Sequence, residues 1–349
     1  MFEEIFEHKI LTNNTKVMVL GINKVTQPIY VWDLFCVSKK NLLVVTNTLY
    51  EANMLYKTLN QYDKDKVLLF PMDDFLVSEA VAISPDLMSK RIETLNELVK
   101  NNVGKIVITN FMGYLRFLPS KKLWSNLNIN LKEKDEINRD LLIQKLNMIG
   151  YKKDSIVTKT GEYANRGYIL DVFPYGNENP IRIEFFDNEI ESIREFNPDT
   201  QLSMQKKETI EICPFTEFIN EKNIEGIIER QSLLPRVVKN VSKIEDYLDD
   251  NITIYVDLNS IKLAYENTIN EVLEFKETDQ FNIDKYMFDL NDIIKDKYVD
   301  ILKLDNYDVK EGKKEIYSSA EIDKFNGNYD RINHFLKNML DSKKMIVLY

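Results

Sequence analysis

Arginine and an aromatic side chain share the polar face of a short predicted strand within residues 161–201. The sequence at 181–186 is IRIEFF, in which apolar residues alternate with Arg182, Glu184 and Phe186. Because a strand repeats every two residues, the first set faces a core and the second faces outward. Arginine beside an aromatic residue is typical of an interface hot spot, so this face predicts protein docking. The plainer interpretation stays open, in which Phe186 caps a hairpin and the arginine balances charge, because single exposed aromatics are common.

A two-residue turn is predicted at 187–188, because Asp-Asn tolerates the positive φ that tight hairpins require. Such a turn pairs Phe186 with Glu189 and Glu184 with Glu191. Two glutamates would then face each other and need a nearby cation.

Arg166 and Arg182 are the nearest candidates to neutralise that pair. Arg166 lies in an Asn-Arg-Gly turn that opens the predicted strand 168–173. Nearby tyrosines could form a stacking platform for bases, and they are Tyr163, Tyr168 and Tyr175. The acidic neighbours make this a minor interpretation, and they are Glu178, Glu184, Asp187, Glu189 and Glu191.

The first predicted strand is followed by a loop that lacks the residues of a phosphate loop. That motif, Gly-x4-Gly-Lys-[Ser/Thr], needs glycines for backbone contact with phosphate, a lysine for the β and γ phosphates, and a hydroxyl for magnesium. Gly21 occupies the first glycine position, but Thr26, Gln27 and Pro28 occupy the others. Lys24 lies three positions too early to substitute. We therefore expect no ATP binding of the usual kind and no cofactor.

Other candidate sites are weaker. Asp73-Asp74 could hold magnesium, but a pair beyond a strand end is more often a turn and helix cap. Cys36 and Cys213 are far apart and, with two histidines in the chain, make an ordinary zinc site improbable on counting alone. Neither His8 nor His334 is near a serine or cysteine nucleophile in sequence. The sequence gives no positive indication of catalysis, and we expect no enzyme activity.

Composition favours a cytoplasmic globular protein with a protein partner. The chain has 349 residues, 44% of them hydrophobic, which is enough for two or three packed domains. No apolar run approaches the roughly 20 residues that span a bilayer, and the acidic start MFEEIFEHKI is unlike a signal peptide. A net charge of −10 argues against general affinity for DNA.

Strands alternate with helices at both ends of the chain, which predicts a mostly parallel sheet covered on both faces. The expected strands are 16–20, 42–45, 67–70, 105–109, 252–258, 299–304, 315–318 and 345–348. The expected helices are 29–37, 48–60, 86–100, 224–233, 260–276 and 331–340. Between them, residues 156–212 read as consecutive strands with turn-length gaps, accompanied by a helix at 139–148 that Gly150 ends.

We therefore predict an α/β fold whose parallel sheet is built from two chain segments, 1–120 and 214–349, with a small α+β domain, 121–213, inserted between them. Because a domain seldom stops on an apolar strand, we also expect the chain to be the amino-terminal portion of something longer.

Three sequence motifs give a specific resemblance. They are GEYANRGYILDVFP, then P-x-R-x-E-F-F-D-x-E-I-E-S-I-R-x-F, then DTQLS. This block resembles the second domain of the UvrB family and of the transcription-repair coupling factor (Mfd) family, and the resemblance extends loosely over the whole chain. It implies a helicase-like fold and a domain that binds UvrA. The contacting positions of the family fall on Arg166, Arg182 and Phe186.

The altered phosphate loop separates the two families, because UvrB keeps the motif while the first domain of the coupling factor resembles a UvrB core whose motif has decayed. The region 70–95 is also too short for the aromatic-rich DNA-gripping hairpin of UvrB. The resemblance implies a non-catalytic, amino-terminal UvrB-like module that recruits UvrA to stalled transcription. RNA polymerase and DNA would be contacted only through missing carboxy-terminal domains. The alternatives are a UvrB-type ATP-dependent damage-binding protein and a structural spacer in a motor protein.

Overall fold

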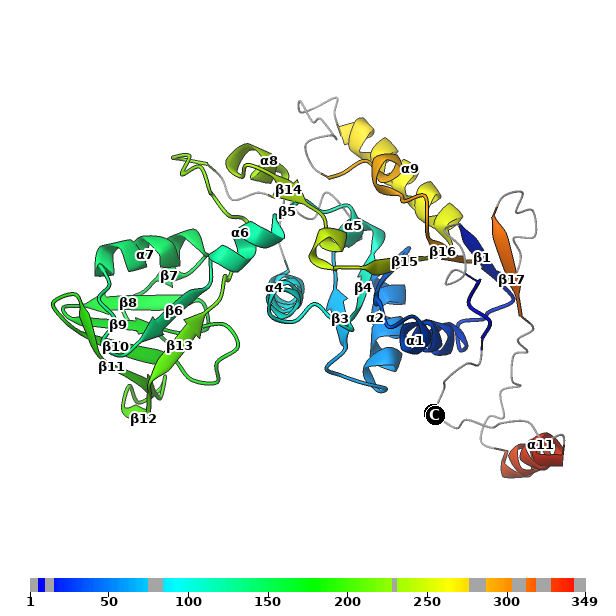
Figure 1. The fold of residues 1–349 in the computed structure, drawn as a ribbon, viewed down its shortest axis with the longest axis horizontal. Coiled ribbons are helices and arrows are strands. Elements are labelled where there is room, and N and C mark those ends of the chain that lie inside the picture. The colour runs from blue at the N-terminus through cyan, green and yellow to red at the C-terminus, as the bar shows by residue number, and fades with distance from the viewer. Residues whose placement is uncertain are drawn as a thin grey trace.

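The computed structural model describes residues 6–9, 16–74, 84–227, 231–275, 287–302, 312–317 and 328–341. Its body is a parallel sheet covered by helices, and a smaller sheet domain extends from one side of that body (Figure 1). Among the described residues, no helix combines the length and apolar character needed to cross a membrane.

The large sheet has seven parallel strands in the order β17-β1-β16-β15-β2-β4-β3. Four strands come from the first part of the chain: β1 (Val17–Leu20), β2 (Asn41–Thr46), β3 (Val67–Phe70) and β4 (Ile106–Asn110). Three come from the last part: β15 (Asn251–Val256), β16 (Val299–Ile301) and β17 (Lys313–Ile316). Because β15 and β16 lie between β1 and β2, neither segment can form this sheet alone. The predicted fold class is confirmed.

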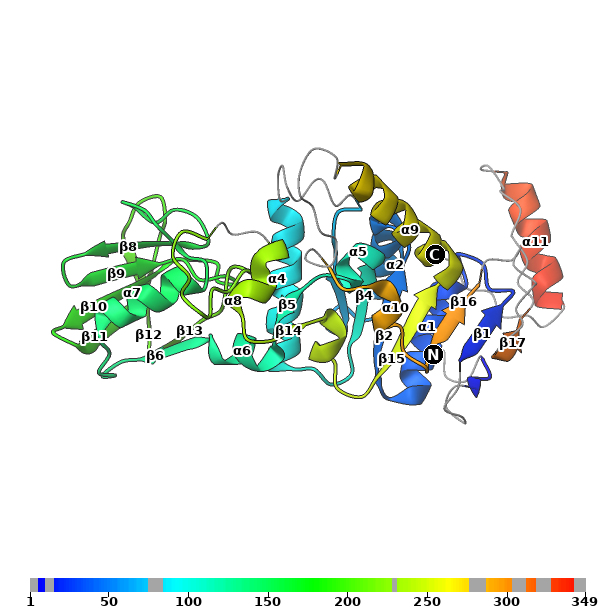
Figure 2. The same ribbon diagram turned by 90° about the horizontal axis from the view of Figure 1, so that it is seen from above.

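The apolar runs of these strands are buried on both sides. One face packs against α1 (Gln27–Ser38) and α2 (Leu49–Asn60). The other face packs against α4 (Pro85–Lys100), α5 (Phe111–Tyr114), α9 (Leu258–Phe275) and α10 (Leu290–Ile293). Figure 2 shows α4 at the side of the body nearest the small domain.

The small domain is built on a six-stranded sheet in the order β12-β11-β10-β9-β8-β7. Its strands are β7 (Lys152–Lys153), β8 (Glu162–Arg166), β9 (Ile169–Val172), β10 (Ile181–Phe186), β11 (Glu189–Phe196) and β12 (Ser203–Lys207). One face of this sheet packs against α7 (Arg139–Met148) and the pair formed by β6 (Ile129–Lys132) and β13 (Thr209–Ile212). Helix α7 begins where Asn138 accepts the N–H groups of Asp140 and Leu141, and it ends before Gly150 at φ 95°.

Short elements connect the two parts. They are β5 (Leu118–Pro119), α6 (Lys121–Asn126), η2 (Gln231–Leu233), α8 (Leu234–Val237), β14 (Val241–Ser242) and η3 (Ile244–Tyr247). The amphipathic α11 (Tyr329–Asp341) follows near the carboxyl end. The predicted domain boundaries at 120/121 and 213/214 stay a prediction.

The predicted helix at 224–233 is wrong for residues 224–227, while residues 228–230 lie outside the described residues. Residues 221–222 and 225–226 form turns, and Asn223 and Gly226 adopt positive φ values of 51° and 68°. A right-handed helix cannot contain that conformation, so regular helix starts only at α8. The predicted strand at 345–348 lies outside the described residues.

Candidate functional site

The outer face is the face of the small domain's sheet that points away from α7. On β10 the isoleucines and Phe185 are buried in the core, whereas Phe186 is 75% exposed. Cross-strand partners point to the same side of a sheet. The register therefore gives the outer face two rows: Ala164, Asp171, Arg182, Arg194 and Lys206, then Arg166, Ile169, Glu184 and Ser192.

Arg182 is held rigidly at the centre of the outer face. Its Nε and Nη2 donate to the two oxygens of Asp171 at 2.7 and 2.9 Å, and its Nη1 donates to the Gln201 carbonyl at 3.3 Å. The guanidinium also lies 4.6 Å from the ring centre of Phe196. The hydrogen bonds that Arg182 donates to Asp171 raise the pKa of Arg182, so its charge is permanent. A bidentate pair and a stacked ring fix the guanidinium plane, which preorganises it for a partner.

Arg166 is bound to the same carboxylate. Its Nη2 donates to Asp171 at 3.0 Å, while its side chain is 49% exposed. Asp171 is buried and thus joins the two arginines that the sequence singled out. Sequence reasoning missed Asp171. Its signal was an acidic residue in the strand ILDV, on the face opposite Leu170.

The expected Glu184–Glu191 pair is wrong. The ladder between β10 and β11 shifts between Glu184 and Phe185, so Glu184 pairs with Ser192. The Ser192 hydroxyl donates to Glu184 at 2.6 Å, and Arg194 lies 3.9 Å from the same carboxylate. A bulge leaves one residue of the longer strand without an opposite partner, and here that residue is Glu191.

The tip of the hairpin agrees with the sequence. Asp187 has φ 57°, and Phe186 pairs with Glu189 as expected. Tyr168 is 69% exposed, and its carbonyl accepts the N–H of Phe185. Phe186 is thus a large apolar side chain exposed at the end of the strand that also carries Arg182.

The loop after β1 is closed by its own hydrogen bonds. The N–H groups of Val25 and Thr26 donate to the Asn23 side-chain oxygen at 3.1 and 3.0 Å, and Gln27 donates to the Asn23 carbonyl at 3.0 Å. In a phosphate loop, such N–H groups point at the ligand. Gly21 has φ 79°, and a side-chain carbon there would lie 1.8 Å from the Tyr317 carbonyl oxygen. Pro28 lies in the first turn of α1.

The weaker candidates have structural roles. Asp74 accepts the N–H of Leu49 at 2.8 Å in the first turn of α2, whose N-cap is Thr48. The described residues contain no cluster of three or more potential metal ligands. His8 contacts Asp33 at 2.9 Å in a buried pair. Burial raises the pKa of the Cys213 thiol to about 11, so it is not a thiolate at neutral pH.

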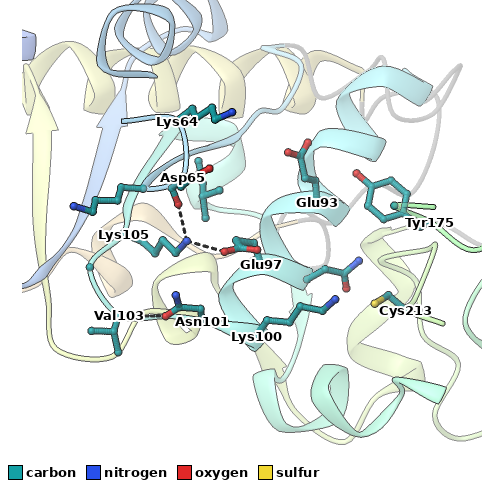
Figure 3. A pocket seen from close by; sticks show the side chains of 15 residues that line it. Lys64, Asp65, Glu93, Glu97, Lys100, Asn101, Val103, Lys105, Tyr175 and Cys213 are labelled. Atoms are coloured by element: carbon teal, nitrogen blue, oxygen red, sulfur yellow. Dashed lines mark hydrogen bonds and ion pairs between the residues drawn. The ribbon is translucent and has the colours of Figure 1, made fainter. Parts of the chain in front are cut away.

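A cavity of about 630 Å³ is lined by α4, by residues 64–68 and 101–105 of the parallel-sheet body, and by Tyr175, Gly176 and Cys213 (Figure 3). Several of its charged residues have partners within the protein. Lys105 donates to Glu97 and to the Asp65 carbonyl, both at 2.7 Å, and Lys100 lies 2.6 Å from Glu211. Lys105, Glu97 and Lys100 are thus engaged in ion pairs within the protein.

Comparison with known proteins identifies the small domain. Residues 129–218 match the UvrB interaction domain family. The chain also has relatives among curated proteins. It is 35% identical over 203 residues to a transcription-repair-coupling factor of Staphylococcus aureus (strain bovine RF122 / ET3-1), and the match covers 58% of this chain and 17% of that protein. It is 31% identical over 218 residues to the transcription-repair-coupling factor of Staphylococcus haemolyticus, covering 62% of this chain and 18% of that protein.

These matches confirm the resemblance seen in the sequence. The chain spans less than a fifth of the length of the relatives that it matches. The UvrB interaction domain contains the whole outer face, from β8 to β12. The UvrA-contacting roles of Arg166, Arg182 and Phe186 stay a prediction.

Proposed function

We propose that this chain is a non-catalytic recruitment module that binds UvrA through the outer face and links stalled transcription to nucleotide-excision repair. The observation that carries the proposal is the preorganised arginine on the same strand face as an exposed phenylalanine, within a UvrB interaction domain. A fixed guanidinium and a large aromatic side chain are the residues that most often dominate binding energy at protein interfaces.

The similarity to transcription-repair-coupling factors supports the same proposal. In it, the parallel sheet holds the UvrB interaction domain in place and performs no chemistry. RNA polymerase and DNA are contacted by other parts of a longer protein. The self-contained loop at Asn23 disfavours the alternative of a UvrB-type ATP-dependent enzyme, because its N–H groups are occupied.

Calorimetric titration with purified UvrA tests the proposal. Phe186→Ala and Arg182→Ala are each expected to weaken binding by roughly 2 kcal/mol or more, as truncation of an interface anchor does. Arg166→Ala is expected to weaken it as well, since Arg166 shares Asp171 with Arg182. Leu263→Ala is the matched control, because Leu263 is an exposed apolar residue on α9, outside the UvrB interaction domain.

Unchanged affinity in a folded Arg182→Ala, Phe186→Ala double variant would exclude the outer face as the docking site. If replacing these residues abolishes binding to no partner, the structural spacer would be favoured instead.

A further inference from the structure

Three neighbouring strands each present a cation in one row of the outer face. Arg182 on β10 is opposite Arg194 on β11, and Arg194 is opposite Lys206 on β12. Adjacent strands are about 4.8 Å apart, and like charges directly opposite each other are destabilising. Such a row gains stability when anions bind along it.

The three cations differ in how fully their donors are used. Arg182 donates three hydrogen bonds, two to Asp171 and one to the Gln201 carbonyl. Lys206 is 62% exposed and lies 3.0 Å from Glu133. Among the described residues, Arg194 has only the 3.9 Å contact with Glu184, whose carboxylate already accepts the Ser192 hydroxyl.

Arg194 is therefore the cation with the most unused hydrogen-bonding capacity in this row. A guanidinium carries five N–H donors. Within the part of the chain that the structure describes, the buried Nε of Arg194 has no hydrogen-bond partner, while the side chain as a whole is 43% exposed. Because Nε is buried, a partner carboxylate would bind the terminal N–H groups of the guanidinium, in a charge-assisted hydrogen bond.

We propose that Arg194 is a further anchor of the docking face and binds a carboxylate on an acidic surface of UvrA. This inference rests on the proposed function and extends it from the β10 residues to β11. A planar guanidinium recognises a carboxylate in a bidentate fork. A phosphate backbone is a poorer occupant, because the same hairpin exposes Glu189 and Glu191.

The partner surface thus has two complementary features: an apolar pocket for Phe186, and carboxylates for the arginines. Electrostatic complementarity of this kind fixes register and raises the association rate, so its effect depends on salt.

Titration of the full chain into UvrA tests the inference with three variants. Arg194→Ala is expected to raise Kd about tenfold or more, as loss of an arginine anchor does. Arg194→Lys keeps the charge and the stem but not the fork, so it is expected to lose only part of the affinity. Arg236→Ala, which removes an exposed arginine from α8, is the matched control and should leave Kd within about twofold.

Salt dependence supplies a second measurement. The Kd of the wild-type chain should rise with salt more steeply than that of Arg194→Ala, because one charge pair is missing from the variant. Thermal melting of each variant shows whether the fold is kept, and Arg194→Lys remains informative should Arg194→Ala melt early.

The outcomes separate the two ideas. Suppose that folded Arg194→Ala has the Kd and salt dependence of the wild-type chain, while Phe186→Ala loses binding. That result would overturn the role of Arg194 and keep the proposed function. Absence of UvrA binding by the wild-type chain would overturn both.

Discussion

Asp171 organises the candidate site although no sequence motif marks it as functional. Its buried carboxylate accepts hydrogen bonds from Arg166 and Arg182, which lie on two different strands. A buried carboxylate is stable only when it is paired and hydrogen-bonded. Asp171 thus converts two flexible arginines into fixed features of the outer face.

Removing that charge has a measurable consequence. Asp171→Asn leaves two guanidinium groups around a neutral amide, so we expect the free energy of unfolding to fall by about 2 to 4 kcal/mol. This estimate lies below the full cost of breaking a buried pair because Arg166 can turn toward water. Urea unfolding followed by circular dichroism measures it.

The control for that experiment is Asp199→Asn, which makes the same chemical change on an exposed residue of the same domain. It should alter stability by no more than about 0.5 kcal/mol. Equal stability of Asp171→Asn and the wild-type chain would mean that the carboxylate does not hold the arginines.

Helices and strands were predicted correctly where local sequence signals agreed with tertiary packing. The parallel strands are continuous apolar runs, and α7 has both its cap, Asn138, and its terminating Gly150. The predicted pairing of β10 with β11 failed because it depends on the register of their hydrogen-bonded ladder. The segment EIESIREF of β11 is compatible with more than one register, and the bulge near Glu191 depends on pairing with β10, which the sequence alone does not encode locally.

The helix expected at 224–233 failed for a related reason. Its apolar spacing suits a helix, but Gly226 adopts a left-handed conformation that a right-handed helix cannot contain. The positions of Arg182 and Phe186 followed from the period of two, whereas the carboxylate that orients the arginine required knowledge of which strand lies beside β10.

The loop after β1 yields a prediction about nucleotides. Because its N–H groups donate to Asn23 and its motif positions are Gln27 and Pro28, ATP or ADP with magnesium should not raise the melting temperature. A ligand present at about 100 times its Kd would add about 2.7 kcal/mol of stability, which is easily detected. A saturable, magnesium-dependent rise at submillimolar ATP would contradict this expectation and favour the UvrB-type enzyme.

A buried ion cluster connects the UvrB interaction domain to the parallel-sheet body. Glu217 lies near the end of the matched domain. It accepts Nε of Arg91 at 3.0 Å, Nη2 of Arg91 at 2.8 Å and Nη2 of Arg116 at 3.2 Å. A further contact crosses from the same domain to α4, where the Tyr175 hydroxyl donates to the Ser89 carbonyl at 3.3 Å. These contacts set the direction in which the outer face points.

The cluster also makes stability depend on pH. Burial alone would raise the pKa of Glu217, but Arg116 and Arg91 outweigh it and hold that pKa below its ordinary value. A carboxyl group with a lowered pKa in the folded state stabilises the fold above its unfolded pKa of about 4.3. That stabilisation is lost as the pH falls through the folded pKa.

We therefore expect Glu217→Gln to be less stable than the wild-type chain by about 3 kcal/mol at pH 7, because two buried arginines lose their counter-charge. The difference should begin to narrow as the pH falls below the unfolded pKa of about 4.3, and it should be lost as the pH falls through the lower pKa of Glu217 in the folded chain. Urea unfolding between pH 7 and pH 3 measures this stability difference. Glu225→Gln is the control, because it makes the same change at an exposed glutamate of the same connecting region. A stability difference that stays constant over the whole pH range would show that Glu217 acts through packing and not through its charge. The cluster lies far in sequence from Arg182 and Phe186. A folded Glu217→Gln variant should therefore still bind UvrA, because the substitution loosens the connection between the two domains but leaves the docking face intact.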